Sequence, residues 1–298
     1  MTIQKDSVAY LALVTAAFVW GGSVVAQKVA LGPFSAVEVS VFRGIGALGI
    51  LIPLWWWQDR AVTKWGPGDV PILIALGLGV LGNHLLILYG LQFIGAGAAG
   101  VIIGSSPAIT ALLSSLIIKD VPFKKVWSGC VISFIGVALV SGIQKVNHPG
   151  ENPFVGGILV VLALVSWALY TIGSRRVMDR MSALTVNWTT LLISLVFQVP
   201  LLWTDHKVLS AGIDSIPVSG WMALLYVMVF ATALGQQAWL FGVSRIGPSR
   251  AGVFTNLIPV SSVVLSILVL GEVLTPVKII GILLVLGGVW LVHQKSTA

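Results

Sequence analysis

The hydrophobic positions of this chain form long unbroken runs rather than the one-sided patterns of soluble helices and strands. Runs of about 18–24 residues recur ten times, near residues 8–30, 36–57, 70–93, 97–118, 125–143, 155–176, 183–203, 219–243, 249–270 and 276–293. At 1.5 Å per residue, each run is long enough to cross a hydrocarbon core about 30 Å thick. Backbone amides in lipid must find partners within their own segment. The pattern therefore predicts an all-α integral membrane protein with ten transmembrane helices.

The connections between these runs are short. The longest, near 143–154 and 204–218, are too small to fold alone, so we expect no soluble domain. The first run is too long for the apolar core of a signal peptide, and no small-residue cleavage site follows it. It is expected to remain as the first transmembrane helix.

An internal duplication organises the runs. Residues 89–140 and 241–292 align without a gap, and roughly fifteen of about fifty positions match. The matches include Gly90/Gly242, Ile94/Ile246, Gly95/Gly247, Ala99/Ala251, Gly100/Gly252, Pro107/Pro259, Gly129/Gly281 and Gly136/Gly288. Five helices per half is an odd number, so the halves must enter the membrane in opposite directions. We therefore predict two inverted five-helix repeats, residues 1–145 and 146–298, an arrangement typical of secondary transporters.

Basic residues predict the orientation. With both ends of the chain in the cytoplasm, the inner side holds Lys5, Arg60, Lys64, Lys119, Lys124, Lys125, Arg175, Arg176, Arg180, Arg245, Arg250 and Lys295. The outer side holds only Lys28, Lys145, Lys207 and Lys278. Cytoplasmic loops carry the excess of Lys and Arg, which favours this orientation.

Composition narrows the class further. The chain is 57% hydrophobic and 9% charged, which excludes a soluble domain. Its net charge of +7 comes from basic residues scattered along the chain, a distribution that fits membrane topology and argues against a nucleic-acid partner.

The first helix of each half carries a polar and aromatic face. Trp20 aligns with Trp167, and neighbours lie at helical spacing on the same face. These neighbours are Ser23 and Gln27 in the first half, and Tyr170, Thr171 and Ser174 in the second. A tryptophan far from either membrane interface either fills the protein interior or lines a cavity, and both readings are open.

The third helix of each half carries a polar couple, Asn83–His84 in one and Gln236–Gln237 in the other. Polar groups inside a membrane are costly unless partnered, so they face the bundle or a water-filled pathway. Symmetry would set the couples opposite each other, although hydrogen bonding between helices without a ligand is the competing interpretation. Tyr89 and Trp239 extend these helices with aromatic surface, and Asn187 and Asn256 are weaker candidates.

Arg43 is the basic residue that lies clearly within a span. A guanidinium suits a substrate carboxylate, but it could equally snorkel or pair with backbone carbonyls. Glu38 is a conceivable partner, yet Ser35-Ala-Val-Glu38 reads as a capping box at a helix start, and Ser182 begins the matched helix.

Acidic residues are scarce where ion coupling would need them. Apart from Glu38, no carboxylate lies inside a span, which favours downhill or weakly coupled transport. His84 is the remaining candidate proton carrier. The histidines are far apart in the sequence and no catalytic motif appears, so we expect no enzyme and no metal site.

Two glycine patterns, Gly77–Gly82 and Gly95–Gly100, fit G-x-G-x-x-G. Neither follows a strand, so no dinucleotide cofactor is expected, and close helix approach is the better explanation. Pro107 and Pro259 lie at matched sites within apolar runs and are candidate hinges.

Several segments resemble one family. The run Leu270-Gly-Glu-Val-Leu274, followed by Ile280-Gly281 and Gly287-Gly-Val289, resembles the closing motif of EamA-type domains of the drug/metabolite transporter superfamily. Ala17–Ser23 and Phe42-Arg43 resemble its first two helices, whereas Lys119-Asp120 departs from the closing motif in the first half. Among members, the chain looks most like YddG-type exporters of aromatic amino acids.

The resemblance implies a secondary transporter of the bacterial cytoplasmic membrane that exports aromatic or neutral amino acids by alternating access. The alternative is an exporter of drugs or other metabolites with the same architecture. The expected partners are a small-molecule substrate and the lipid bilayer, with no cofactor, and the sequence specifies no oligomeric state. The predicted substrate-binding residues are Trp20, Ser23, Arg43, Asn83, His84, Tyr89, Trp167, Tyr170, Gln236, Gln237 and Trp239.

Overall fold

The computed structural model describes residues 2–59, 66, 68–117, 123–142, 152–208, 212–247 and 251–293, and over these residues it contains helices and no strand. The first half holds α1 (Thr2–Ala30), α2 (Ala36–Gln58), α3 (Asp69–Phe93), α4 (Ala96–Ile103), α5 (Ser106–Ile117) and α6 (Phe123–Gly142). The second half holds α7 (Pro153–Val177), α8 (Ala183–Gln198), the short helices η1 (Val199–Trp203) and η2 (Ile213–Ser215), α10 (Val218–Tyr226), the π-helix η3 (Val227–Gly235), α11 (Gln236–Ile246), η4 (Val253–Asn256), α13 (Leu257–Leu270) and α14 (Pro276–His293).

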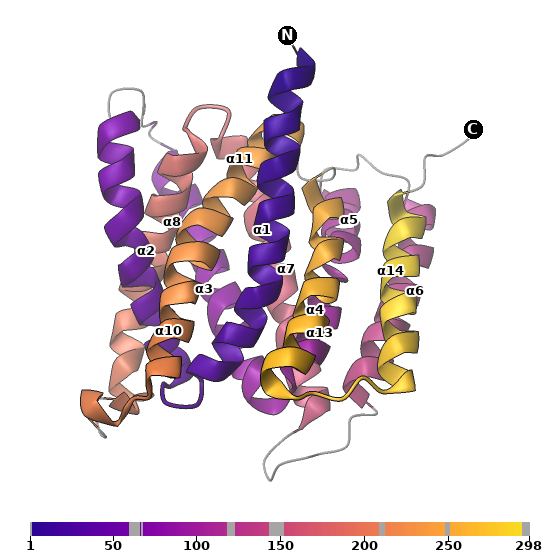
Figure 1. The fold of residues 1–298 in the computed structure, drawn as a ribbon. Coiled ribbons are helices and arrows are strands. Elements are labelled where there is room, and N and C mark those ends of the chain that lie inside the picture. The colour runs from indigo at the N-terminus through magenta and orange to yellow at the C-terminus, as the bar shows by residue number, and fades with distance from the viewer. Residues whose placement is uncertain are drawn as a thin grey trace.

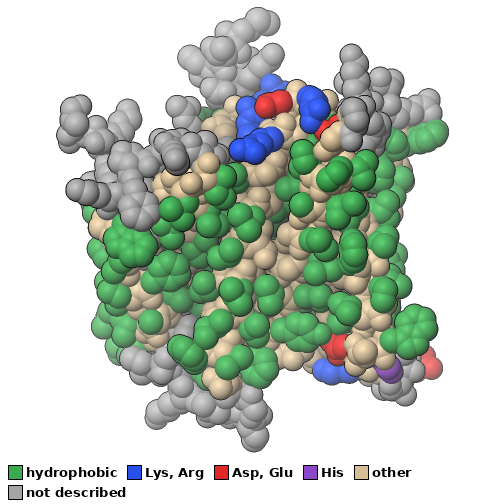
Figure 2. Space-filling model, turned by 180° about the vertical axis from the view of Figure 1, so that it is seen from behind, with side chains coloured by type: hydrophobic (Ala, Val, Ile, Leu, Met, Phe, Trp, Pro, Cys, Tyr) green, Lys and Arg blue, Asp and Glu red, His purple; other side chains and the backbone are tan. Residues whose placement is uncertain are grey.

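Many of these helices have the length and composition of membrane spans. In the described part of the chain, seven helical stretches qualify: Ser7–Ala30, Ala36–Gln58, Asp69–Phe93, Ala96–Ile117, Pro153–Val177, Ala183–Trp203 and Val218–Ile246. Shorter apolar helices cover Trp127–Leu139, Phe254–Leu270 and Pro276–Gly288. On the face shown in Figure 2, apolar side chains cover the middle of the bundle, and charged groups lie at its two ends. The protein is thus a multi-pass membrane protein, and the count of ten spans stays a prediction.

Hydrogen bonds at the helix ends fix the relative directions of the first helices of each half. Lys28, near the end of α1, donates to the carbonyls of Leu91 and Ile94 at the end of α3, at 2.5 and 3.2 Å. Arg180, just after α7, instead pairs with Asp69 at the start of α3. Helices α1 and α7 therefore run in opposite directions through the bundle (Figure 1).

The second helices are also antiparallel. The start of α2 is tied to the residues after η1, because Val37 N donates to Asp205 Oδ2 at 3.3 Å. The end of α2 is tied to the start of α8 by a hydrogen bond from Ser182 Oγ to Asp59. Helix α2 thus starts where the α8–η1 segment ends, and it ends where α8 starts.

Matching helices of the two halves have matching packing partners: where a helix of one half packs on a helix of the other, the two counterparts also pack on each other. Helix α3 packs on α7 and α8, and the α10–α11 segment packs on α1 and α2. Helices α6 and α14 pack on each other, as do α4 and α13. This match is what two inverted repeats would produce, while the division at residue 145 stays a prediction.

Glycines let α6 and α14 cross at backbone contact distance. A Cβ atom at Gly136 would stand 2.7 Å from the carbonyl oxygen of Gly281, and one at Gly288 would stand 2.5 Å from that of Gly129. The matched positions of the two halves therefore face each other across this crossing.

The capping box at Ser35 is confirmed. Glu38 N donates to Ser35 Oγ at 3.0 Å, and Ser35 N donates to Glu38 Oε2 at 2.8 Å. The other carboxylate oxygen of Glu38 accepts from the backbone amides of Lys207 and Val208, at 3.0 and 2.7 Å. Glu38 is therefore a buried cap that also fixes the segment after η1. Ser182 caps the matched helix α8.

Both proline-containing runs are interrupted. Helix α4 ends at Ile103 and α5 begins at Ser106, directly before Pro107. In the second half, η4 ends at Asn256 and α13 begins before Pro259. Proline lacks an N–H and clashes with the carbonyl four residues earlier, so the α-helical ladder stops there. The predicted hinges are thus breaks, and residues 97–118 are not one continuous helix.

Apart from Arg43, which lies inside the bundle, several described basic residues mark its two opposite ends. Arg180 lies beside Asp69, at the end where α1 begins, while Lys28 and Lys278 lie at the end where α3 finishes, the latter paired with Glu272 at 3.3 Å. The side chains of Lys5, Arg60, Lys64, Lys119, Lys124, Lys125, Lys145, Arg250 and Lys295 lie outside the described residues. Which end faces the cytoplasm stays a prediction.

Candidate functional site

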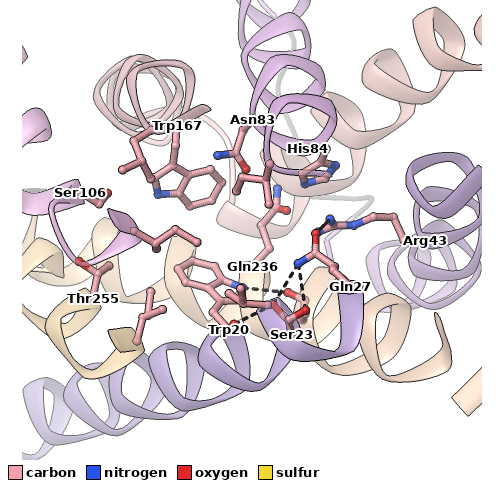
Figure 3. Close-up of a pocket in the computed structure, with 16 residues that line it drawn as sticks. Trp20, Ser23, Gln27, Arg43, Asn83, His84, Ser106, Trp167, Gln236 and Thr255 are labelled. Atoms are coloured by element: carbon pink, nitrogen blue, oxygen red, sulfur yellow. Dashed lines mark hydrogen bonds between the residues drawn. The ribbon is translucent and has the colours of Figure 1, made fainter. Parts of the chain in front are cut away.

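A pocket lies inside the bundle, between helices of both halves. Its empty space amounts to about 650 Å³, a figure that includes space open to solvent. Its lining is Trp20, Ser23, Val24, Gln27, Arg43, Asn83, His84, Ile87, Ile103, Ser106, Leu164, Trp167, Ala231, Gln236, Thr255 and Ile258. Figure 3 shows the tryptophans toward one side and Arg43, Gln27 and His84 toward the other.

Aromatic rings form the apolar wall. The rings of Trp20 and Trp167 are 5.4 Å apart at 90°, and Trp239 lies 5.3 Å from Trp20 behind the lining. The indole Nε1 of Trp20 donates to the carbonyl of Ala231 in η3 at 3.1 Å, which holds the ring in place. Such edge-on contacts are favourable because of the ring quadrupole. The wall is therefore rigid and apolar.

Arg43 forms the opposite, polar end. Its side chain extends from α2 to two other elements. Nε donates to Thr232 Oγ1 at 2.9 Å, and Nη1 donates to Gln27 Oε1 at 3.3 Å. Gln27 is itself oriented by a hydrogen bond to the carbonyl of Ser23 at 3.1 Å. Arg43 is 7% exposed as a residue and lines the pocket, so its charge lies inside the bundle.

The polar couple on α3 divides into two roles. Asn83 Nδ2 donates to the carbonyl of Ala163 on α7 at 3.0 Å, which is the interhelical hydrogen bond considered from the sequence. His84 is 3% exposed, and its Nδ1 has no hydrogen-bond partner in the described structure. Interhelical bonding therefore explains Asn83 but leaves the Nδ1 of His84 without a protein partner.

The polar couple of the second half also divides. Gln236 Nε2 donates to the hydroxyl of Tyr170 at 3.3 Å, and Gln236 lines the pocket. Gln237 Oε1 accepts from Asn187 Nδ2 at 3.2 Å and lies outside the lining. One glutamine thus faces the pocket and the other connects α11 to α8.

The structure brings together seven of the eleven predicted site residues in this lining: Trp20, Ser23, Arg43, Asn83, His84, Trp167 and Gln236. It places the other four outside it. Tyr170 and Trp239 lie behind the aromatic wall, Gln237 contacts α8, and Tyr89 donates to Asp205 Oδ2 at 3.1 Å. Tyr89 therefore anchors the segment after η1.

Sequence reasoning left three polar lining residues out of the predicted set. The helical spacing places Gln27 on the same face as Trp20, so its position in the lining is predictable from the sequence. Ser106 directly precedes Pro107 at the first helix break, and Thr255 lies in η4 at the second break, four residues before Pro259. The prolines were the signal for these two.

Among the described residues that line the pocket, none is acidic and none is a cysteine. In the part of the chain whose side chains are described, no group of three or more His, Cys, Asp and Glu side chains could hold a metal ion. The site is therefore an aromatic and amide-lined pocket with one cationic group.

The structure is thus a helical membrane bundle with a pocket lined by residues of both halves, an arrangement that many small-molecule membrane transporters share. The chain belongs to the EamA-like transporter family, whose model matches residues 7–142 and 154–294. The family and the relatives below are transporters, which generally are not enzymes.

Similar proteins are known in several bacteria. An uncharacterised transporter of Bacillus subtilis, YyaM, is 29% identical over 94% of this chain and 92% of its own, and another, YetK, is 25% identical over 99% and 89%. A probable terminal-alkyne amino-acid exporter of Streptantibioticus cattleyicolor is 24% identical over 98% and 96%. A crystal structure with a TM-score of 0.67 and 18% identity covers 96% of both chains, which shows the shared fold.

Proposed function

We propose that this protein exports aromatic or neutral amino acids, or similar small metabolites, across the bacterial cytoplasmic membrane. The observation that carries the proposal is the pocket itself, which takes its lining from both halves and pairs a tryptophan wall with a polar end. An amphipathic solute with a bulky apolar part fits such a surface.

The transport cycle we propose is alternating access by two inverted five-helix units, residues 1–145 and 146–298, in ten spans with both chain ends in the cytoplasm. Three observations support it: the two segments matched by the family model, the opposite directions of α1 and α7, and the matching packing partners of the two halves. Rocking of one unit against the other would open the pocket to each side in turn.

Amino-acid export is favoured over export of cationic drugs by the charge of the lining. Arg43 is basic and no lining residue is acidic, so a cationic drug would find no counter-charge. One relative is named as a probable amino-acid exporter. Ion coupling is not part of the proposal, because no lining carboxylate is present to carry a proton or sodium ion.

Flux from proteoliposomes tests the proposal. Vesicles containing the full chain are loaded with labelled phenylalanine or tryptophan, and release is compared with protein-free vesicles. Saturable release in excess of the protein-free rate supports amino-acid export. A rate equal to that of protein-free vesicles for both amino acids would overturn it.

A further inference from the structure

The buried charge of Arg43 has no protein counter-ion in the described structure. The ion pairs found there are Arg175–Asp179, Arg180–Asp69 and Lys278–Glu272. Glu38 lies one helix turn and a half from Arg43 on α2, but its two oxygens accept backbone amides. A charge removed from water is costly unless it is paired. The bundle thus keeps a cation in its interior without supplying the anion.

The guanidinium also has hydrogen-bond donors to spare. Arginine carries five N–H groups in a planar fork. Arg43 uses two of them, one to Thr232 and one to Gln27, and the other three have no protein partner in the described structure. These two hydrogen bonds orient the guanidinium and leave its other N–H groups available to a ligand. A carboxylate could therefore bind to an already oriented guanidinium.

A second buried polar group beside Arg43 lacks a partner. The Nδ1 atom of His84 is buried without a hydrogen bond, and His84 lines the same pocket. Figure 3 shows His84 and Gln27 next to Arg43, while Trp167 lies on the far side. The end of the pocket at Arg43 thus combines the unused donors of its guanidinium with a second buried polar side chain, that of His84.

We propose that Arg43 anchors the carboxylate of the transported solute, with its apolar part against Trp20 and Trp167, and that the site selects solutes by charge. The lining offers no acid for an ammonium group, so a monoanion binds at least as well as a zwitterion. A neutral isostere binds more weakly, and a cation does not bind. This inference rests on the proposed function, since it names the substrate class of the same pocket.

The competing explanation is that Arg43 is a structural tether. It joins α2 to α1 through Gln27 and to η3 through Thr232, so its loss could loosen the bundle. A tether predicts reduced stability with unchanged preference among ligands. An anchor predicts a change in charge preference, and only this second quantity separates the two.

Four ligands that share a benzyl group supply the test: N-acetylphenylalanine, its uncharged amide, phenylalanine and phenethylamine. Their binding to the purified full-length protein in nanodiscs is measured by calorimetry at neutral pH. A charge-assisted hydrogen bond contributes about 1.5–3 kcal/mol, so the wild type should prefer the carboxylate to its amide by roughly 10- to 100-fold. Phenylalanine should bind no more tightly than N-acetylphenylalanine, and phenethylamine should not bind.

Three variants test whether Arg43 is the source of the preference for the carboxylate over the amide. Arg43→Gln should reduce the carboxylate-to-amide ratio to about one. Arg43→Lys should keep part of it, because lysine retains the charge but not the fork. Arg245→Gln, which removes a positive charge outside the pocket lining, should keep all of it.

The wild-type comparison needs no variant, so a misfolded Arg43→Gln protein does not remove the test. Equal binding of N-acetylphenylalanine and its amide to the wild type would overturn the inference, as would an unchanged ratio in folded Arg43→Gln. If either result is obtained but phenylalanine flux is observed in proteoliposomes, only the role of Arg43 is rejected, and the proposal of amino-acid export is retained. Absence of that flux together with absence of binding by all four ligands would overturn both.

Discussion

The indole of Trp20 meets the indole of Trp167 edge-on, with the ring centroids 5.4 Å apart and the ring planes at 90°. The two residues occupy aligned positions in the two halves of the sequence and lie on the antiparallel helices α1 and α7. Trp239 contacts both, at 5.3 and 6.2 Å. The two halves therefore touch through aromatic rings at the pocket wall.

Replacing Trp167 should impair transport by the protein that folds and is reconstituted. Trp167→Ala removes half of the edge-on pair and part of the wall against which an apolar solute would lie, which we expect to reduce flux by roughly 10-fold or more. Flux of labelled phenylalanine per reconstituted molecule is the measurement. Trp203→Ala is the control, because Trp203 is 82% exposed and outside the lining.

Gln236→Ala should reduce flux as well, because Gln236 lines the pocket and its amide is oriented by Tyr170. Amide groups that bond a ligand typically contribute about 0.5–1.5 kcal/mol, which corresponds to a loss of roughly 2- to 12-fold. Gln237→Ala serves as its neighbour control and should leave flux higher than Gln236→Ala. If Trp167→Ala and Gln236→Ala both transport normally, the solute does not use this pocket.

Glu38→Ala should destabilise the protein without altering ligand preference. The substitution removes the acceptor of three backbone N–H groups, those of Ser35 and Val208, which are buried, and that of Lys207, which is partly buried. Loss of the cap and of buried hydrogen bonds should cost about 2–4 kcal/mol, visible as a lower melting temperature in detergent. A change in the carboxylate-to-amide ratio of the folded variant would instead show that Glu38 acts as the counter-ion of Arg43.

Adjacent glycines in α14 should respond oppositely to alanine. Gly288→Ala places a methyl group against the backbone of α6 and should cost about 1–3 kcal/mol through overpacking. Gly287 has open space around its Cβ position, so Gly287→Ala should be neutral or stabilising by up to about 1 kcal/mol. Melting temperatures of both variants provide the comparison. Equal destabilisation would contradict the close crossing of α6 and α14.

Transport should not depend on an imposed proton gradient. The described lining residues include no carboxylate, and the prediction assumes the downhill transport proposed above. Initial rates of phenylalanine release should therefore agree within about 2-fold with and without a pH difference of about one unit across the vesicle membrane. Accumulation against a concentration gradient, driven by pH, would identify a proton carrier, and His84→Gln would then test whether that residue is responsible.

The fold was largely predictable because its strongest signals are local. The run predicted at 36–57 corresponds to α2 at Ala36–Gln58, and the capping box of Ser35 and Glu38 predicts where it begins. Three-dimensional features were less accessible. The π-helix η3 leaves no pattern in a run that is apolar throughout, and the break at Gly104–Ser105 was foreseen only as a hinge at Pro107.

The pocket was predictable where residue type and helix face agreed. Trp20 and Ser23 share one face of α1 and both line it. Gln236 and Gln237 could not be separated, because adjacent residues on a helix point about 100° apart and the sequence does not say which direction faces inward. Tyr170 lies one turn from Trp167 yet is fully buried behind it, a depth that spacing alone does not encode.

The π-helix η3, which precedes α11, determines the directions in which the side chains of α11 point. A π-turn holds an additional residue, so each such insertion rotates the following side chains by about 100° relative to an uninterrupted α-helix. Segment length in η3, and not composition alone, thus decides which glutamine is presented to the solute. Removing one amino acid between Val227 and Gly235 would turn α11 by about 100° about its axis and present a different set of its side chains to the pocket.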